Sequence, residues 1–260
     1  MKIAALSDIH GNLAALDAVL ADVATVGADV VVNLGDSLSG PLQVAQTAAR
    51  LRASDILSIA GNHERQLLDV WRGPRDAIDA ATSDGYAATE LDDDIAAWIT
   101  TLPPHHWLTP QVLLSHGTPG SDLHYWLETI TPDAGVGGSR GMRAATPDEV
   151  RERLHTMPGV ERAGLIFCGH THVPRAVQCG EVLIVNPGSV GLQAYTDDHP
   201  HWHAVENGSP HARYALVEQT PRGWQVELRR VVYDWDAPAE IAARRGRDDW
   251  AIALRTGRMG

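Results

Sequence analysis

Five short apolar runs of this 260-residue chain each end in a cluster drawn largely from Asp, Asn, His and Gly. One such cluster is typical of an ordinary turn or helix cap, but five at successive strand ends are not. Because ligands bind outside the carboxyl ends of strands in open α/β sheets, we expect the clusters to meet at one sheet edge. In chain order they are Asp8-Ile9-His10, Gly35-Asp36, Gly61-Asn62-His63-Glu64, His116-Gly117 and Gly169-His170-Thr171-His172.

The apolar runs also predict the fold class. Runs at 2–6, 29–34 and 56–60 alternate with helix-compatible segments, which is typical of βαβ units. Later runs, at 112–115, 164–168, 182–185, 213–218 and 224–233, include several that alternate like half-buried antiparallel strands. The sequence therefore predicts one α/β domain over residues 1–260, with two packed sheets flanked by helices.

Three segments stand apart from this pattern. Residues 117–162 contain scattered Gly and Pro, and residues 195–211 are polar and rich in His. Long irregular segments inside a compact domain are often functional rims or lids, so we interpret both as insertions near the site. A C-terminal helical segment at 237–257 is expected to dock through Trp250, Ile252 and Leu254, with its arginines facing solvent.

Composition limits the possible partners. The formal net charge of −12 argues against a general nucleic-acid binder, which needs a basic face. The two cysteines are too few for a disulfide framework, and no apolar run approaches the roughly 20 residues that span a bilayer. We therefore expect a cytoplasmic protein with a small-molecule partner, no stable nucleic-acid partner and no membrane association. Its oligomeric state is left open.

The residue types in the clusters favour metal ions. Carboxylate, imidazole and amide oxygen suit Mn²⁺, Fe, Ni or Zn, and the absence of Cys disfavours a structural zinc site. Seven candidate ligands are too many for one catalytic ion with an open position, whereas two divalent ions sharing a carboxylate would use them all. The candidates are Asp8, His10, Asp36, Asn62, His116, His170 and His172.

This ordered set of motifs resembles the calcineurin-like metallophosphoesterase superfamily. The chain length and the VNPGSVG stretch at 185–191 are similar to its small bacterial phosphodiesterase-like branch. The resemblance implies a four-layer α/β/β/α sandwich of two mixed sheets, with a dinuclear metal site at the carboxyl edge of the strands. It also implies two ligand sets that share Asp36 as the bridge: Asp8, His10, Asp36 and His172 for one ion, and Asp36, Asn62, His116 and His170 for the other.

The resemblance also implies a role for His63, which would protonate the leaving group while a metal-activated water attacks phosphorus. The family commonly has Asp after this His, whereas this chain has Glu64, so Glu64 is the candidate that orients His63. Mn²⁺ is the first choice of metal. Asp36 and His63 are thus the predicted catalytic residues.

The predicted activity is metal-dependent hydrolysis of small or nucleotide-like phosphodiesters. Phosphomonoester hydrolysis by the same centre is the alternative, because the ligand set does not decide how many ester groups the substrate carries. A non-catalytic protein-binding scaffold is a third reading, disfavoured by the intact ligand set.

Several further residues remain open candidates. Asn12 and Arg65 are proposed substrate contacts, although a helix cap and a surface ion pair are the ordinary alternatives. The tract His199, His201 and His203 is interpreted as a solvated rim or a substrate contact. Three residues of the first insertion lie close enough to His116 in the chain to reach the site: Ser121, Asp122 and His124.

Overall fold

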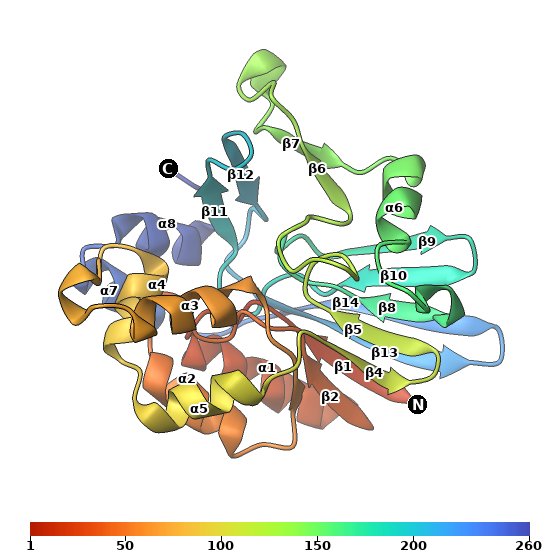
Figure 1. Ribbon diagram of the computed structural model, residues 1–260, viewed down its shortest axis with the longest axis horizontal. Coiled ribbons are helices and arrows are strands. Elements are labelled where there is room, and N and C mark those ends of the chain that lie inside the picture. Colours follow the sequence, from red (N-terminus) through yellow and green to blue (C-terminus); the bar gives the residue numbers. More distant parts are fainter.

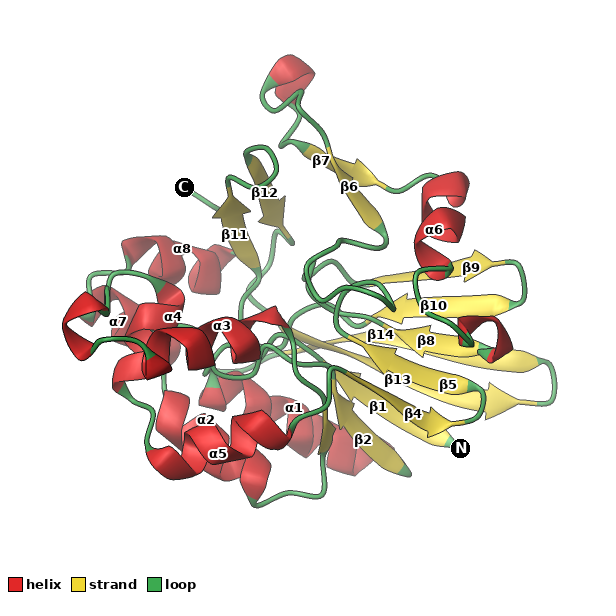
Figure 2. Cartoon of the chain, viewed as in Figure 1, coloured by secondary structure: helices red, strands yellow, loops and turns green.

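Two five-stranded mixed sheets pack face to face in the computed structural model, which describes residues 1–260 (Figures 1 and 2). The first sheet has the order β14-β13-β1-β2-β3 and the second β4-β5-β8-β10-β9. The strands of the first sheet are β1 (Lys2–Leu6), β2 (Val30–Asn33), β3 (Leu57–Ser58), β13 (Ala212–Thr220) and β14 (Gly223–Val231). Those of the second are β4 (His105–Thr109), β5 (Val112–Ser115), β8 (Leu165–Phe167), β9 (Arg175–Cys179) and β10 (Val182–Asn186).

Each sheet has a parallel centre and antiparallel edges. Strands β1, β2 and β3 run parallel, as do β5, β8 and β10. Antiparallel partners flank both groups: β13 and β14 in the first sheet, β4 and β9 in the second. All five strands that precede the polar clusters therefore belong to the parallel centres.

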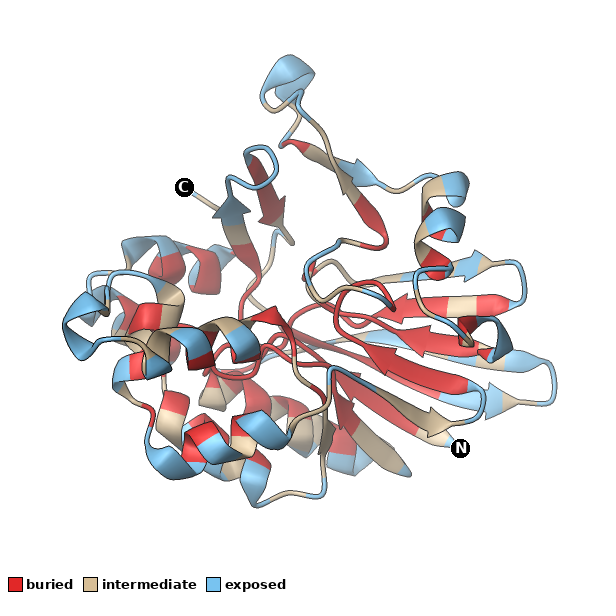
Figure 3. Ribbon diagram, in the orientation of Figure 1, coloured by how far each residue is buried: buried red, intermediate tan, exposed pale blue.

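Alternation along the strands builds the core. In β1, Ile3 and Ala5 join a buried cluster between the two sheets, while Ala4 and Leu6 face the opposite way and pack with α1. Such a period of two is what a strand buried on both faces requires. The buried residues run through the middle of the sheets, and exposed ones lie at the strand ends away from the helices and along the helix surfaces (Figure 3).

Helices cover the outer faces of the sheets. Helix α1 packs on the first sheet, and α6 with its neighbouring loop covers the second, so the four-layer α/β/β/α expectation is confirmed, with a thin fourth layer. A separate helical cluster of α2 to α5 buries its own apolar core. The helices are α1 (Leu13–Val26), α2 (Val44–Arg52), α3 (Asn62–Arg72), α4 (Ser83–Thr89), α5 (Asp93–Thr101), α6 (Pro147–Leu154), α7 (Asp236–Arg244) and α8 (Asp248–Thr256). None of them combines the length and apolar character needed to cross a membrane.

The segments at 117–162 and 195–211 contain two hairpins that stand beside each other above the sheets (Figure 1). The first pairs β6 (Glu128–Ile130) with β7 (Met142–Ala144), and the second pairs β11 (Ala194–Asp197) with β12 (His203–Glu206). The strand expected at 56–60 is only two residues long, because the chain leaves the sheet early to enter the Gly61 cluster.

The expectation of a single C-terminal helix is wrong, whereas the expectation of solvated arginines holds for three of its four arginines. The segment breaks into α7 and α8 at Gly246, whose φ of 76° is left-handed and ends a helix. Trp250 and Leu254 are buried as expected, but Ile252 is exposed. Arg244, Arg245 and Arg255 are exposed as expected, although Arg245 also pairs with Glu90, and only Arg247 is partly buried against Asp249.

Candidate metal centre

The five clusters converge where the two sheets meet the helical region. Each cluster follows the carboxyl end of a parallel strand: β1, β2, β3, β5 and β8. Two groups of side chains result, each with ligand atoms that lie within 4.8 Å of one another: Asp8, His10 and His172 in the first group, and Asp36, His116 and His170 in the second. The sheets thus bring together residues up to 164 positions apart, the separation of Asp8 and His172 (172 − 8).

The backbone of these residues is unusual. The non-glycine residues with positive φ are Asp8, His10, Asp36, His170 and His172, with φ between 52° and 68°. Left-handed backbone costs a non-glycine residue roughly 1–2 kcal/mol. All five belong to the two candidate groups, so the strain is concentrated at one site, where it aims the side chains inward.

Gly61 shows how closely the clusters approach. A Cβ atom there would collide with the Asp36 carboxylate and come within 2.8 Å of the His116 ring. Only glycine leaves room for the carboxylate to lie between these residues. The glycine in this cluster is therefore part of the packing of the site.

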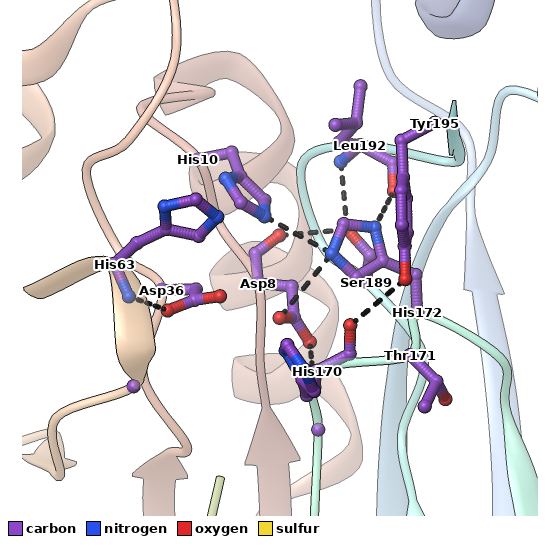
Figure 4. Close-up of polar contacts among 12 residues, drawn as sticks. Asp8, His10, Asp36, His63, His170, Thr171, His172, Ser189, Leu192 and Tyr195 are labelled. Carbon is purple, nitrogen blue, oxygen red and sulfur yellow. Dashed lines mark hydrogen bonds and ion pairs between the residues drawn. The ribbon is translucent and has the colours of Figure 1, made fainter. Parts of the chain in front are cut away.

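In the first group, backbone carbonyls fix both imidazoles. His10 Nδ1 donates to Ser39 O at 2.8 Å, and His172 Nδ1 donates to Leu192 O at 2.7 Å. The Nε2 atoms, which then carry lone pairs, face each other at 3.1 Å (Figure 4). Asp8 Oδ1 lies 3.4 Å from His172 Nε2 and, although buried, accepts no hydrogen bond. Acceptors crowded around one point suit a shared cation.

The second group repeats this chemistry. His116 Nδ1 donates to Leu34 O at 2.8 Å, so its Nε2 faces Asp36 Oδ2 and Asn62 Oδ1, each at 3.1 Å. The Asn62 amide nitrogen donates to Gln66, which turns the amide oxygen toward the group. His170 is held through Nε2 by the Leu123 carbonyl, which leaves Nδ1 as its ligand atom. All seven predicted ligands thus lie in or beside the two groups.

Charge reinforces this interpretation. Burial lowers the pKa of His10, as does the neighbouring His172, to about 4, so its imidazole is neutral and able to bind a metal. Burial alone would also lower the pKa of His116, but the Asp36 carboxylate raises it to about 10. The negative charge that holds a proton there would equally hold a metal ion. The donor set therefore fits two divalent cations.

His63 occupies a distinct position beside the two groups. Its backbone N–H donates to Asp36 Oδ1 at 2.9 Å, and its ring lies edge-on to His10 with the centroids 5.6 Å apart. Burial tends to lower the pKa of His63, but the charge of Asp36 and the hydrogen bond to Asp84 raise it to about 9. A protonated imidazole is thus available at the edge of the site.

The prediction that Glu64 orients His63 is wrong. Glu64 is buried and accepts hydrogen bonds from the backbone N–H groups of Gly61, Asp36 and Ser37 at 2.7–2.8 Å, so it ties the β2 and β3 turns together. His63 Nδ1 instead binds Asp84 of α4 at 2.9 Å. No sequence pattern pointed to Asp84, because it is 21 residues away (84 − 63) on a helix that follows an irregular loop.

Neither of the two proposed substrate contacts lines the cavity of the site. Asn12 is buried, caps α1 through Ala15 N, and donates to Gly191 O and Tyr233 Oη. Arg65 pairs with Asp122 at 2.9 Å and does not line the cavity of the site. Both residues take the ordinary role that the sequence left open.

The stretch 185–191 braces the site from outside the ligand set. Ser189 Oγ donates to Asp8 O and accepts from Leu192 N, both at 2.8 Å. Asn186 donates to Gly169 O at 2.7 Å, which connects the turn after β10 to the turn after β8. The loop therefore locks two ligand-bearing turns to each other.

A cavity of about 750 Å³ opens from these residues. One end, the proximal end, contains His10, Asp36, Asn62, His63, His170 and His172. The other end, the distal end, is formed by β11, the chain on either side of it, and the C-terminal segment: Leu192, Ala194, Thr196, Asp197, His199, Pro200, Arg247, Asp249, Trp250, Ala253 and Met259. Tyr125 and Tyr195 also line the cavity.

The two hairpin segments are joined above the proximal end by aromatic side chains. The Tyr195 ring lies edge-on to His172, and Tyr125 lies edge-on to His170. Tyr125 Oη is 2.5 Å from Tyr195 Oη and donates to His203 Nε2 at 3.0 Å. His199 is an exposed rim residue as expected, whereas His203 is buried, so the rim interpretation of that residue is wrong. The first insertion reaches the cavity through Leu123, Tyr125 and Ile130, not through Ser121, Asp122 or His124.

Comparison with known proteins gives a family match over most of the chain. The profile of the calcineurin-like phosphoesterase superfamily domain matches residues 1–206. The phosphodiesterase YfcE of Escherichia coli is 26% identical over 204 residues, which cover 74% of this chain and 80% of that protein. An uncharacterized protein of Methanocaldococcus jannaschii is 24% identical over 271 aligned positions, which cover 95% of this chain and 94% of that protein.

Two crystal structures share the fold along the whole chain. A metallophosphoesterase from Sphaerobacter thermophilus superimposes with a TM-score of 0.73 at 23% identity, covering 99% of both chains. A hypothetical protein from Pyrococcus horikoshii superimposes with a TM-score of 0.71 at 18% identity, covering 100% of this chain and 99% of that one. The similarity of fold extends to the C-terminal helices, beyond the profile match.

Proposed function

We propose that this chain, which belongs to the calcineurin-like phosphoesterase superfamily, is a phosphodiesterase that uses two divalent metal ions and acts on small or nucleotide-like phosphodiesters. Phosphoester hydrolysis is the general activity of the family. The number of ions, their identity, the diester preference and the residue roles below are the proposal.

One observation carries the proposal most directly. His10 Nε2 and His172 Nε2 face each other at 3.1 Å while both Nδ1 atoms donate to carbonyls. Asp8, His10 and His172 would hold one ion, and Asn62, His116 and His170 the other, with Asp36 shared between them. Bound divalent ions supply Lewis-acid stabilisation of phosphoryl charge and lower the pKa of water. Mn²⁺ is our first choice, with Fe, Ni or Zn as alternatives for this nitrogen and oxygen donor set.

His63 is the proposed general acid. As a water oxygen bonds to phosphorus, the bond from phosphorus to the departing alcohol oxygen breaks, and that oxygen needs a proton. His63 is partly exposed to the cavity, carries a raised pKa and is held by Asp84, so it can deliver the proton and regain one from water. Asp84 is a positioning residue, since it acts through His63.

The shape of the cavity favours a diester. Walls extend beyond His63 toward α8 and beyond His170 toward the first insertion, so a phosphorus atom at the proximal end could carry a substituent on either side. The E. coli relative is named a phosphodiesterase, which agrees with this choice.

The two cysteines are free thiols, as expected for the cytoplasmic location that we propose.

The test is a substrate pair with one leaving group. Protein loaded with Mn²⁺ is assayed on bis(p-nitrophenyl) phosphate and on p-nitrophenyl phosphate. The proposal expects kcat/KM for the diester to exceed that for the monoester by at least about tenfold, a difference of roughly 1.4 kcal/mol in transition-state stabilisation. The reverse order would favour the monoesterase alternative, and no turnover of either substrate by protein that binds two ions would favour a scaffold.

A further inference from the structure

The distal end of the cavity differs chemically from the proximal end. Apolar side chains dominate its wall, among them Leu192, Ala194, Trp250 and Ala253, which belong to one buried cluster, with Met259 packed against it. Residues 236–260 lie beyond residues 1–206, over which the family profile matches. The profile therefore does not cover the C-terminal part of this wall, whereas residues 192–200 of the wall lie within it.

The charged groups of the distal end are paired. Arg247 is the single Arg or Lys that lines the cavity, and Asp249 binds its guanidinium through both oxygens, at 2.9 and 2.7 Å. Asp197 adds a second carboxylate, 3.6 Å from the exposed His199. No unpaired cation therefore faces the distal end, and an anionic group placed there would meet one carboxylate, that of Asp197, which Arg247 does not neutralise.

The distal end adjoins the proposed general acid. Arg247 Nη1 lies 3.4 Å from Ser83 Oγ and 3.3 Å from Ala81 O, next to Asp84, the partner of His63. On the other side, the Trp250 ring lies edge-on to His10 with the centroids 6.0 Å apart. An alcohol that leaves beside His63 would therefore enter the distal end.

We propose that the distal end is the leaving-group site and that it selects an uncharged alcohol with a flat apolar face, such as a nucleoside, over an alcohol that carries a further anionic group. This inference rests on the proposed phosphodiesterase function and specifies its substrate class. Apolar walls favour the flat group through burial, and the Asp197 carboxylate, with Arg247 held by Asp249, disfavours added negative charge.

The test uses three methyl phosphodiesters that share a primary alcohol leaving group: thymidine linked through its 5′ oxygen, the same nucleoside with a 3′-phosphate, and glycerol. Each diester is incubated with the protein and Mn²⁺, and chromatography measures the methyl phosphate that is formed. Methyl phosphate appears only when the tested alcohol departs. Thymidine is expected to exceed glycerol in kcat/KM by about tenfold, the effect of burying roughly 60 Å² of apolar surface. The kcat/KM of the thymidine diester should exceed that of the thymidine 3′-phosphate diester by a similar factor.

Asp249→Asn tests the charge argument, because it releases Arg247 from its partner. The ratio of kcat/KM for thymidine 3′-phosphate to that for thymidine should rise about tenfold, as expected for freeing one charge near the ligand. Asp248→Asn is the matched control, since Asp248 is the exposed neighbour in the same helical turn and does not line the cavity. Its ratio should stay that of the unmodified protein.

Met259→Lys is a second variant, needed if Asp249→Asn destabilises α8. It adds a cation to the same wall and should also raise the ratio of kcat/KM for thymidine 3′-phosphate to that for thymidine. Calorimetric binding of free thymidine and thymidine 3′-phosphate to metal-free protein should show the same order. Equal kcat/KM for thymidine and glycerol, or a ratio that neither variant moves, would overturn the inference. The same preparations are also assayed on bis(p-nitrophenyl) phosphate. If they hydrolyse it, the phosphodiesterase proposal stands and only the leaving-group inference fails.

Discussion

The two ends of the cavity differ in the backbone that supports them and in the side chains that line them. At the proximal end, strand ends hold buried acids and imidazoles in left-handed backbone, and carbonyls or neighbouring side chains fix the orientation of each ring. At the distal end, apolar side chains and paired charges come from a hairpin and from α8 with its flanking residues, whose non-glycine residues have negative φ. Rigid sheet edges thus position the candidate metal ligands, while separate segments form the rest of the cavity wall.

The largest expected effect comes from breaking the proximal end. Asp36→Ala removes the carboxylate that faces His116 and accepts the His63 N–H. Loss of several kcal/mol of electrostatic stabilisation should lower kcat/KM by about 1,000-fold or more. Metal content measured by mass spectrometry should fall with activity. Asp17→Asn, a change at an exposed acid on α1, is the control, and retention of both metal and rate in the Asp36 variant would contradict the assignment.

His63→Ala should produce the next largest effect and should leave the metal groups intact. Loss of a general acid typically lowers the rate by about 100-fold to 10,000-fold. The loss should be much smaller for a p-nitrophenol leaving group, which departs without a proton, than for an alkyl alcohol. A metal content near two per chain, together with equal losses for both leaving groups, would remove the proposed role of His63.

Asp84→Asn should have an intermediate effect, because the carboxylate acts only through His63. Partners that orient a functional histidine contribute about 10-fold to 100-fold. The decisive measurement is the double variant: once His63 is Ala, replacing Asp84 should change kcat no further. Additive losses would show that Asp84 acts independently of His63.

The smallest expected effect is that of Arg65→Ala. Its ion pair with Asp122 is exposed, and such pairs contribute about 1 kcal/mol or less to stability. Because Arg65 does not line the cavity, kcat/KM should change by less than about twofold, within the ordinary scatter of a surface substitution. A larger loss of activity with unchanged stability would place Arg65 back among the substrate contacts.

The difference between the ends also explains what the sequence could predict. The proximal clusters follow apolar runs directly, so local periodicity located the strands, and the parallel centres placed Asp8, Asp36 and His172 at one edge. The four-layer arrangement followed from the family resemblance and is confirmed by the packing of α1 and α6.

Residues brought in by loops and helices outside the strand pattern could not be predicted. Asp84 reaches His63 from α4, and Arg247 reaches the cavity because the C-terminal segment turns at Gly246. No periodicity connects these positions to the strand ends. Glu64 was misassigned because adjacency in the chain suggested contact, whereas the first turn of α3 directs its carboxylate to the backbone of the β2 turn.

Two cations are expected to bind between the strand-end clusters. An anomalous diffraction experiment on crystals grown with Mn²⁺ tests this expectation directly. We expect two strong peaks, one among Asp8, His10 and His172 and one among Asp36, His116 and His170. A map without density at these side chains, from protein that hydrolyses the diester, would contradict the account.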